Sequence, residues 1–167
     1  MDVALEDVPP SGEPVLARLM QLYAYDFSEI MALDVGEDGR FAGSRVLATC
    51  WSEPWRHPYF VRVGGQLAGF AILDERSRLT GDPEVADVAE FFVMRRYRRQ
   101  GVGAKAAALA FARFPRRWEV RQTAANVAAT AFWRRTIAAY AGKFDEVVVD
   151  DDRWRGPVQS FDARMRR

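Results

Sequence analysis

The sequence predicts a mixed α/β (α+β) fold in which one β-sheet carries helices on both faces. The first observation is the order of the elements: strand-like segments come early, and a strand–helix–strand–helix–strand succession follows. The second is size and composition. At 167 residues, 49% hydrophobic and 28% charged, the chain fits one globular domain, predicted here over residues 1 to 167.

The N-terminal part shows helical periodicity and turn signals. Apolar side chains recur at helical spacing after Pro14, which suits the first turn of a helix. The segment 34–44 is rich in glycine and polar residues, which is typical of a mobile loop. The segment 45–55 is ambiguous, although its apolar residues indicate some packing. The predicted elements are a strand at Val3 to Leu5, a helix that starts at Ser11 or Glu13 with Leu16, Leu19, Met20, Leu22 and Tyr23 at its apolar positions, and a short helix from Phe27 to Leu33.

The rest of the chain alternates between apolar strands and alanine-rich helices. Gly64-Gly65 between two strand-like runs is a hairpin signal. The mostly apolar run that ends at Met94 is typical of a central strand. The predicted strands are Tyr59 to Val63, Leu67 to Leu73, Val85 to Met94, Trp118 to Gln122, Phe144 to Val149 and Ser160 to Met165, and the predicted helices are Gly103 to Phe114 and Ala124 to Tyr140.

Composition argues against several classes of function. The net charge of +1, from 24 basic and 23 acidic residues, disfavours a protein that coats nucleic acid. A single cysteine, Cys50, excludes an internal disulfide, and with the single His57 it is too few for a zinc site. No apolar run reaches the roughly 18 residues that span a membrane, and the N-terminus lacks the basic start of a secretion signal. We therefore expect a cytoplasmic protein with no metal and with no nucleic-acid or membrane partner.

The most informative segment, Phe91 to Lys105, joins an apolar strand to an alanine-rich helix through a basic turn with two glycines. Such a turn presents free backbone N–H groups and the positive end of a helix dipole, so it binds phosphate or pyrophosphate without a metal. The dinucleotide pattern G-x-G-x-x-G is not met, because Ala106 stands at the third glycine position. No G-K-[ST] occurs either, which disfavours a nucleotide-hydrolysing enzyme.

A different pattern fits the turn. Arg98 to Gly103, RRQGVG, matches R/Q-x-x-G-x-G/A, the acyl-CoA pyrophosphate signature of the GNAT superfamily of N-acyltransferases. Asn126 to Trp133 resembles the family's second signature, N-x-x-A-x-x-F-Y, and the hairpin with Gly69 resembles its strands two and three. The resemblance covers roughly residues 58–140. It implies a GNAT-like central sheet of six to seven strands, mixed but mostly antiparallel, splayed at the central strands and covered by helices on both faces.

The resemblance implies acetyl-CoA as co-substrate. The pantetheine arm would add to the splayed strand by edge pairing. The N–H groups of the turn would cradle the pyrophosphate, which glycine allows to approach closely. Arg95 and Arg96 would either add charge toward the 3′-phosphate or form a solvated basic turn. The implied cofactor-binding residues are Phe92, Val93, Met94, Arg98, Arg99, Gln100, Gly101, Val102, Gly103, Ala104, Asn126, Phe132 and Trp133.

The resemblance also implies direct attack by an amine in a ternary complex. An alkylamine of pKa about 10.4 needs a base, and Glu90 stands where family members often carry a catalytic glutamate. The alternative for Glu90 is a structural carboxylate paired with an arginine. A backbone N–H near Val93 or Met94 would stabilise the developing oxyanion. The family's usual acid is a tyrosine where this chain has Trp133, so Tyr140 is the substitute candidate; its alternatives are a packed tyrosine and no dedicated acid.

The acceptor site in the family is formed by the first helices and the loop after them. The residues implied here are Tyr25, Asp26, Trp51 and Glu53, with the two carboxylates attracting a cationic amine. Ordinary packing is the alternative for the aromatic residues. The expected acceptor is a small-molecule amine or a peptide amine. A homodimer, common in the family, is a candidate assembly.

Two other functions are compatible with parts of the sequence. Because Trp133 replaces the tyrosine, an acyl-CoA-binding or regulatory domain with weak or no catalysis stays open. A nucleic-acid-binding module built on Arg95 to Arg99 is disfavoured by the near-neutral net charge and by the alanine-rich helix that follows.

Overall fold

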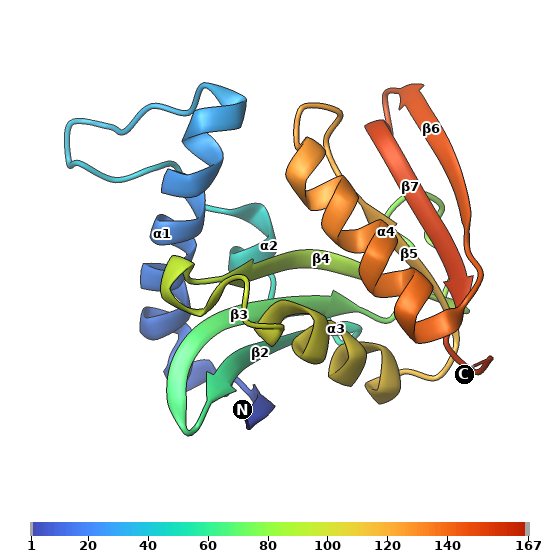
Figure 1. The fold of residues 1–167 in the computed structure, drawn as a ribbon. Helices are drawn as coiled ribbons and strands as arrows, with labels where there is room; N and C mark the ends of the chain where they lie inside the picture. Colours follow the sequence, from blue (N-terminus) through green and yellow to red (C-terminus); the bar gives the residue numbers. More distant parts are fainter. Residues whose placement is uncertain (1, 166–167) are drawn as a thin grey trace.

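The computed structural model describes residues 2–165, so residue 1 and residues 166–167, at the ends of the predicted domain, lie outside the described residues. The described part forms a seven-stranded sheet with helices on both faces (Figure 1). The strands are β1 (Val3–Asp7), β2 (Arg56–Val63), β3 (Gln66–Asp74), β4 (Val85–Val93), β5 (Arg117–Arg121), β6 (Asp145–Asp151) and β7 (Trp154–Asp162). The helices are α1 (Glu13–Met31), α2 (Arg45–Ala48), α3 (Val102–Arg113) and α4 (Val127–Ala141), with the 3-10 turns η1 (Pro10–Gly12) and η2 (Arg95–Tyr97).

The sheet is mixed but mostly antiparallel. Its order is β1-β2-β3-β4-β5-β7-β6, and only β4 and β5 run parallel. A parallel pair needs a crossover connection, which α3 supplies. The predicted fold class is confirmed.

The two parallel strands separate soon after they meet. Their pairing covers only Val85 to Asp87 against Arg117 to Glu119, although β4 continues to Val93 and β5 to Arg121. Figure 1 shows the two strands diverging. Beyond Asp87, β4 therefore has no strand beside it on the β5 side within the described residues, and its backbone edge is open there.

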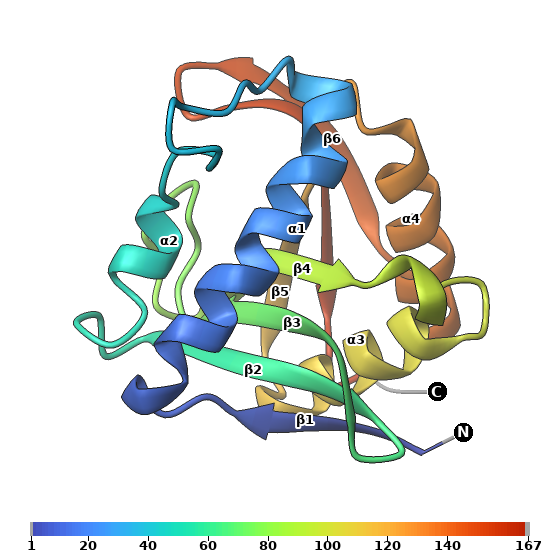
Figure 2. The ribbon, with the colours of Figure 1, turned by 90° about the vertical axis from the view of Figure 1, so that its left-hand side faces the viewer.

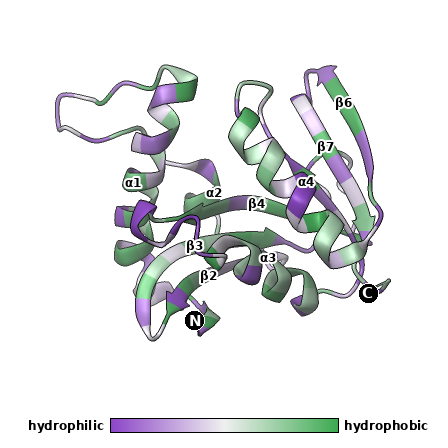
Figure 3. Cartoon of the chain, in the orientation of Figure 1, coloured by the Kyte–Doolittle hydropathy of each residue, from purple (hydrophilic) through white to green (hydrophobic). Residues whose placement is uncertain are grey.

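Two cores lie on opposite faces because side chains alternate along the strands. Phe70 and Phe92 belong to the core under α1 and α2, whereas Ala71 and Val93 belong to the core under α3 and α4. Figure 2 shows α1 and α2 crossing one face of the sheet. Figure 3 shows that the turn after β4 is strongly hydrophilic, in contrast to the strands that precede it.

The separate helix predicted from Phe27 to Leu33 is wrong. Helix α1 runs unbroken to Met31, because no glycine or proline interrupts it, and it ends where Ala32 takes a left-handed φ of 48°. The loop 34–44, predicted to be mobile, is tied to α1. Gln21 accepts a hydrogen bond from the Phe41 N–H at 2.9 Å and donates to the Phe41 carbonyl at 3.2 Å.

The bounds predicted for the last strand are also wrong, since β7 begins at Trp154 rather than Ser160. Gly156 and Pro157 resemble loop residues in the sequence, yet both pair with β6. Gly156 has φ +144°, and a Cβ there would lie 2.1 Å from the Gln122 carbonyl oxygen. The glycine is thus required by a close backbone approach that the sequence alone does not reveal.

Candidate active site

The turn between β4 and α3 presents unpaired backbone N–H groups. Arg99 and Gly101 both adopt left-handed φ angles, 60° and 78°, which reverse the chain so that α3 begins at Val102. The first N–H of this helix to bond backward is that of Lys105, which donates to the Gly101 carbonyl at 3.0 Å. The N–H groups of residues 102–104 therefore point out of the helix N-terminus, where an anion is stabilised.

The turn is packed tightly against α4. A Cβ on Gly103 would lie 3.2 Å from two ring carbons of Phe132, so glycine lets the two helices meet. Val102 is buried beneath the turn. Gln100 closes the turn by donating from its amide to the Arg96 carbonyl at 2.7 Å. Ala104 lies in the first turn of α3 and contributes only a methyl group there.

Two arginines of the turn bind Asp26 of α1 instead of projecting freely. Arg95 lies 2.9 Å from one Asp26 oxygen, and Arg98 pairs with the other. Arg98 also donates to the Val93 carbonyl at 2.7 Å. Partial burial raises the pKa of Asp26, but hydrogen bonds from Arg98 and Arg95 outweigh it and leave that pKa below its usual value. Asp26, expected in the acceptor site, thus joins α1 to the turn between β4 and α3.

A cleft of about 260 Å³ lies where β4 and β5 diverge. It is built from both strands, from α1 and α4, from the turn that precedes β4 and from the start of β7. The lining residues are Tyr23, Phe27, Arg78, Val88, Ala89, Glu90, Phe91, Val120, Arg121, Gln122, Thr123, Asn126, Ala129, Trp133 and Trp154.

Glu90 is the carboxylate in this lining. Burial raises its pKa, and the opposing hydrogen bond from Tyr23 and the charge of Arg78 do not cancel that effect. Burial, together with the nearby Glu90 carboxylate, raises the pKa of Tyr23 well above 10, because both oppose loss of the phenolic proton. Glu90 has no salt bridge in the described residues, so it differs from the arginine-paired structural carboxylate considered as its alternative.

The second signature lies on the opposite wall. Asn126 caps α4 by accepting the Ala129 N–H at 3.1 Å and also lines the cleft. Trp133 is 5% exposed, and its ring centroid lies 5.0 Å from that of Phe91 on β4. Phe132 stacks over the same Phe91 ring at 6.1 Å. The bulky indole therefore closes the α4 side of the cleft.

A chain of buried polar groups fixes the end of β5. The ionised Glu146 can only accept, so the Gln159 amide donates to it at 2.7 Å and presents its oxygen to Gln122. Gln122 donates to that oxygen at 2.8 Å, which turns its own oxygen away. The Gln122 oxygen and the Thr123 hydroxyl are buried without a hydrogen-bond partner, and both residues line the cleft. Such atoms need a partner from a ligand or water.

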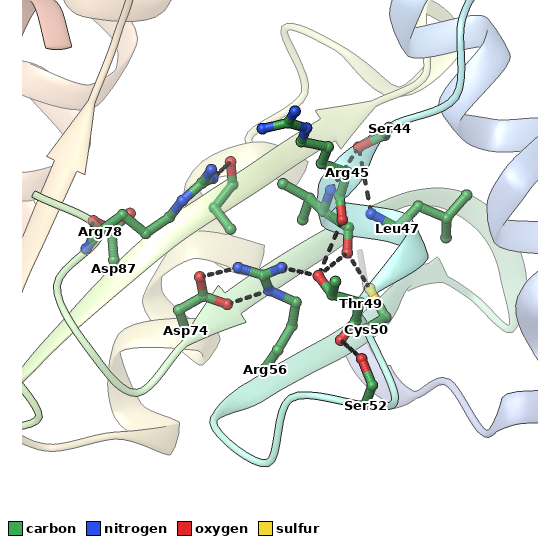
Figure 4. A network of polar contacts seen from close by, with 12 residues as sticks. Ser44, Arg45, Leu47, Thr49, Cys50, Ser52, Arg56, Asp74, Arg78 and Asp87 are labelled. Carbon is green, nitrogen blue, oxygen red and sulfur yellow. Dashed lines mark hydrogen bonds and ion pairs between the residues drawn. The ribbon is translucent and has the colours of Figure 1, made fainter. Parts of the chain in front are cut away.

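A buried ion pair sits at the point where the strands diverge. Asp87 of β4 is fully buried and accepts two hydrogen bonds from Arg121 of β5, each 3.2 Å long. Figure 4 shows Asp87 and Arg78 beside a second network, in which Arg56 joins Asp74 to Thr49.

Burial raises the pKa of Cys50 to about 12, so this thiol behaves as a small core residue.

Several residues expected at the site lie away from the cleft. Tyr140 is buried and packs its ring 5.2 Å from Phe111, seven residues beyond Trp133, which is roughly 10 Å along the helix. Tyr25 is 65% exposed. Trp51 donates to the Val8 carbonyl at 3.0 Å. Glu53 follows α2 and, like Tyr25 and Trp51, does not line the cleft.

Of the two backbone N–H groups expected to stabilise the oxyanion, those of Val93 and Met94, the structure leaves Met94 already bonded. The Met94 N–H donates to the Ala68 carbonyl at 2.8 Å and is already occupied. Val93 pairs with Gly69 across the β3–β4 ladder. Phe92 packs under α1, with its ring 5.7 Å from that of Tyr23.

Sequence reasoning missed the cleft residues that come from other elements: Tyr23, Phe27, Arg78, Arg121, Gln122, Thr123 and Trp154. Tyr23 was expected as an apolar position of the first helix and was not among the residues predicted for the acceptor site. The end of the predicted strand at Gln122 was the one signal that could have located part of the cleft. Residues at the end of a strand that diverges from its neighbour face the gap between the two strands.

Among residues 2–165, no cluster of three or more histidine, cysteine or acidic side chains is placed to hold a metal ion. None of the described helices is both long and apolar enough to cross a membrane.

Comparison with known proteins agrees with this geometry. The family model described as "Acetyltransferase (GNAT) family" matches residues 17–137. No curated protein matches the chain.

Solved structures share the fold at low sequence identity. An acetyltransferase from Thermus thermophilus superposes with a TM-score of 0.71 at 20% identity, over 97% of each chain. The ribosomal-protein-S18-alanine N-acetyltransferase from Escherichia coli gives 0.59 at 15% identity, over 98% of this chain and 96% of that one. An aminoglycoside acetyltransferase in complex with coenzyme A gives 0.68 at 12% identity, over 98% and 96%.

Proposed function

The chain belongs to the GNAT family of acetyltransferases, and on that premise we propose that it transfers the acetyl group of acetyl-CoA to a primary amine by direct attack in a ternary complex. One observation carries the proposal. The edge of β4 that is open after Asp87 leads directly into the turn whose N–H groups at 102–104 are free. A pantetheine arm and a pyrophosphate need these two features in this order.

The residues present fit this co-substrate. Gly103 lets α3 lie against Phe132 and adds no side chain of its own beside the N–H groups of residues 102–104. Arg99 and Gly101 set the turn by their left-handed backbone. When bound, acetyl-CoA supplies the acetyl group as an activated thioester. Several solved structures with this fold, among them an aminoglycoside acetyltransferase, were determined with coenzyme A.

Glu90 is the base in this proposal. Its raised pKa brings it closer to that of the amine it must deprotonate, while Tyr23 donates toward it and keeps it oriented. The amine nitrogen forms the new C–N bond, the C–S bond breaks, and Glu90 takes the proton lost by the amine. A thiolate of pKa about 8.5 is a fair leaving group, so the reaction proceeds without a dedicated acid. Tyr140 is too far along α4 to serve.

A second function is favoured by one observation. Trp133 fills the position where the family's tyrosine stands, which suits an acyl-CoA-binding or regulatory domain with weak or no catalysis. The two functions differ in turnover, because a binding domain retains coenzyme A affinity but releases no thiol.

The test measures thiol release from acetyl-CoA with a panel of amines at pH 8, and coenzyme A binding by calorimetry. Glu90→Gln should lower the rate at least 100-fold without changing coenzyme A affinity, because general-base catalysis contributes about 10²–10⁴. Gly103→Val should instead abolish coenzyme A binding. The matched control is Gly43→Ala, since Gly43 has an ordinary φ and no heavy atom near its Cβ position. Binding without thiol release for every amine would favour the regulatory domain.

A further inference from the structure

We infer that the acceptor in this cleft carries a carboxylate beside its amine: it is a small amino acid with an apolar side chain, bound through its carboxylate by Arg78 while its amine faces Glu90. The inference rests on the proposed function and names the class of substrate for the same site. It is carried by Arg78, the one guanidinium of the cleft lining that has no carboxylate within ion-pair distance in the described part of the chain.

Arg78 reaches the cleft from a rigid turn between β3 and β4. Its backbone N–H donates to the buried Asp87 at 3.1 Å. The neighbouring Ser77 hydroxyl accepts the N–H groups of Leu79 and Thr80, each at 3.1 Å. The base of the Arg78 side chain is therefore fixed at the mouth of the cleft, although the side chain itself is exposed.

The Arg78 guanidinium is nearly uncommitted. Figure 4 shows it extending along β4, where it makes one long contact of 3.4 Å with the Ala89 carbonyl. No carboxylate of the described residues lies within ion-pair distance of it. Arg121, the other arginine of the lining, is held by both oxygens of Asp87. Arg78 thus keeps the planar pair of donors that a carboxylate binds with two parallel hydrogen bonds.

Arg78 is too distant to serve the phosphates of the co-substrate. It contacts β4 at Ala89, and the phosphate-binding turn begins only after Val93. Four strand residues span roughly 13 Å. The Arg78 guanidinium therefore lies near Glu90, at the end of the cleft where the acceptor would bind. There the positive charge of Arg78 acts on the Glu90 carboxylate.

The charge of the cleft lining selects the acceptor further. The charged residues of the lining are Glu90, Arg78 and Arg121. Asp87 neutralises Arg121, so the charges left in the lining are one negative, Glu90, and one positive, Arg78. A polycationic acceptor would find a single carboxylate there and would be repelled by Arg78, which costs binding energy. A zwitterion places its ammonium beside Glu90 and its carboxylate beside Arg78. Tyr23 and Phe27 of α1 and Trp154 of β7 supply aromatic walls, which suit an apolar side chain.

The experiment compares three acceptors that share one phenylethyl group: phenylalanine, phenylalaninamide and 2-phenylethylamine. We expect kcat/KM for phenylalanine to exceed that of both others by about 10- to 100-fold, the gain of one charge-assisted contact. Arg78→Met should reduce this preference to less than about threefold through KM, and Arg78→Lys should keep part of it. The control Arg76→Met should retain the preference, because Arg76 lies in the same turn but contacts Trp55 and the Gly81 carbonyl.

The outcomes separate the two proposals. Equal or better turnover of the uncharged acceptors, of a peptide amine or of an aminoglycoside overturns the inference and leaves the acetyltransferase intact. An equal loss for all three acceptors in Arg78→Met makes Arg78 structural and also overturns it. If no acceptor releases thiol, the proposed function fails. The inference is then decided by calorimetry with coenzyme A present, where phenylalanine must bind at least tenfold tighter than 2-phenylethylamine.

Discussion

Replacing Arg121 with methionine should lower the free energy of unfolding by about 3–5 kcal/mol, because a buried carboxylate would lose its counter-charge. Asp87 has no exposed surface and Arg121 is only 6% exposed, so water cannot take the place of the guanidinium. The two 3.2 Å bonds also hold β4 to β5 just where the strands begin to separate. For a domain of this size the loss corresponds to roughly 6–20 °C in Tm.

The assay is urea unfolding at several pH values. Burial already raises the pKa of Asp87 against the opposing charge of Arg121, and removing that charge raises it further. A carboxyl with a raised folded-state pKa stabilises the fold below its unfolded pKa, and this contribution is lost as pH rises through the folded value. The difference between variant and wild type should therefore shrink as pH falls, because Asp87 then becomes neutral.

The control is Arg116→Met, which breaks a pair with Glu75 in which both side chains are about one-third exposed. Solvent screening limits that loss to about 1 kcal/mol or less. If Arg121→Met costs no more than Arg116→Met at pH 7, or if its cost grows on acidification, the reasoning about the buried pair is refuted.

Two further predictions concern Glu90 on β4 and Gly69 on the neighbouring strand β3. Glu90→Gln should raise the free energy of unfolding at pH 8 while it lowers turnover, because burial raises the pKa of Glu90 and penalises its ionised form. Wild type should lose stability relative to the variant as pH rises above the ordinary glutamate pKa of 4.5. Parallel urea unfolding curves at pH 5 and pH 8 check this sign. Gly69→Ala should destabilise the fold by at least about 1–3 kcal/mol, since its Cβ would lie 2.0 Å from the Phe92 carbonyl oxygen; a Tm equal to that of Gly43→Ala would contradict the predicted clash.

Local signals predicted much of the fold. The Gly64-Gly65 turn defined the β2–β3 hairpin, and the apolar run before Arg95 defined the central strand, because turn chemistry and burial on both faces act over a few residues. The helix predicted from Ala124 exists, but α4 begins at Val127, because the Asn126 side chain accepts the Ala129 N–H and caps it there. The glycine turn was visible for the same reason, since Gly101 adopts a positive φ that other residues resist.

The acceptor side was not predictable in this way. Asp26 resembled a free carboxylate that would attract an amine, but folding brings Arg95 and Arg98 onto it across about seventy positions of sequence. Arg78 carried no signal, because its significance depends on the absence of a carboxylate beside it in the described structure. Gly156 and Pro157 resemble loop residues because the close approach to Gln122 is a tertiary contact.

The sequence by itself indicated the family through its resemblance to two signatures, and it predicted most of the strands and helices and the glycine turn. Turns, helix periodicity and two-residue alternation depend on short-range geometry, so a sequence displays them. Only the tertiary structure decided which charged side chains pair with one another and which face the cleft. The divergence of β4 and β5 after Asp87 opens the cleft, and the residues that line it come from α1, the turn before β4, β4, the end of β5, α4 and β7. Long-range packing decides which charged side chains in the cleft have no ion-pair partner. The proposed class of acceptor is inferred from those side chains.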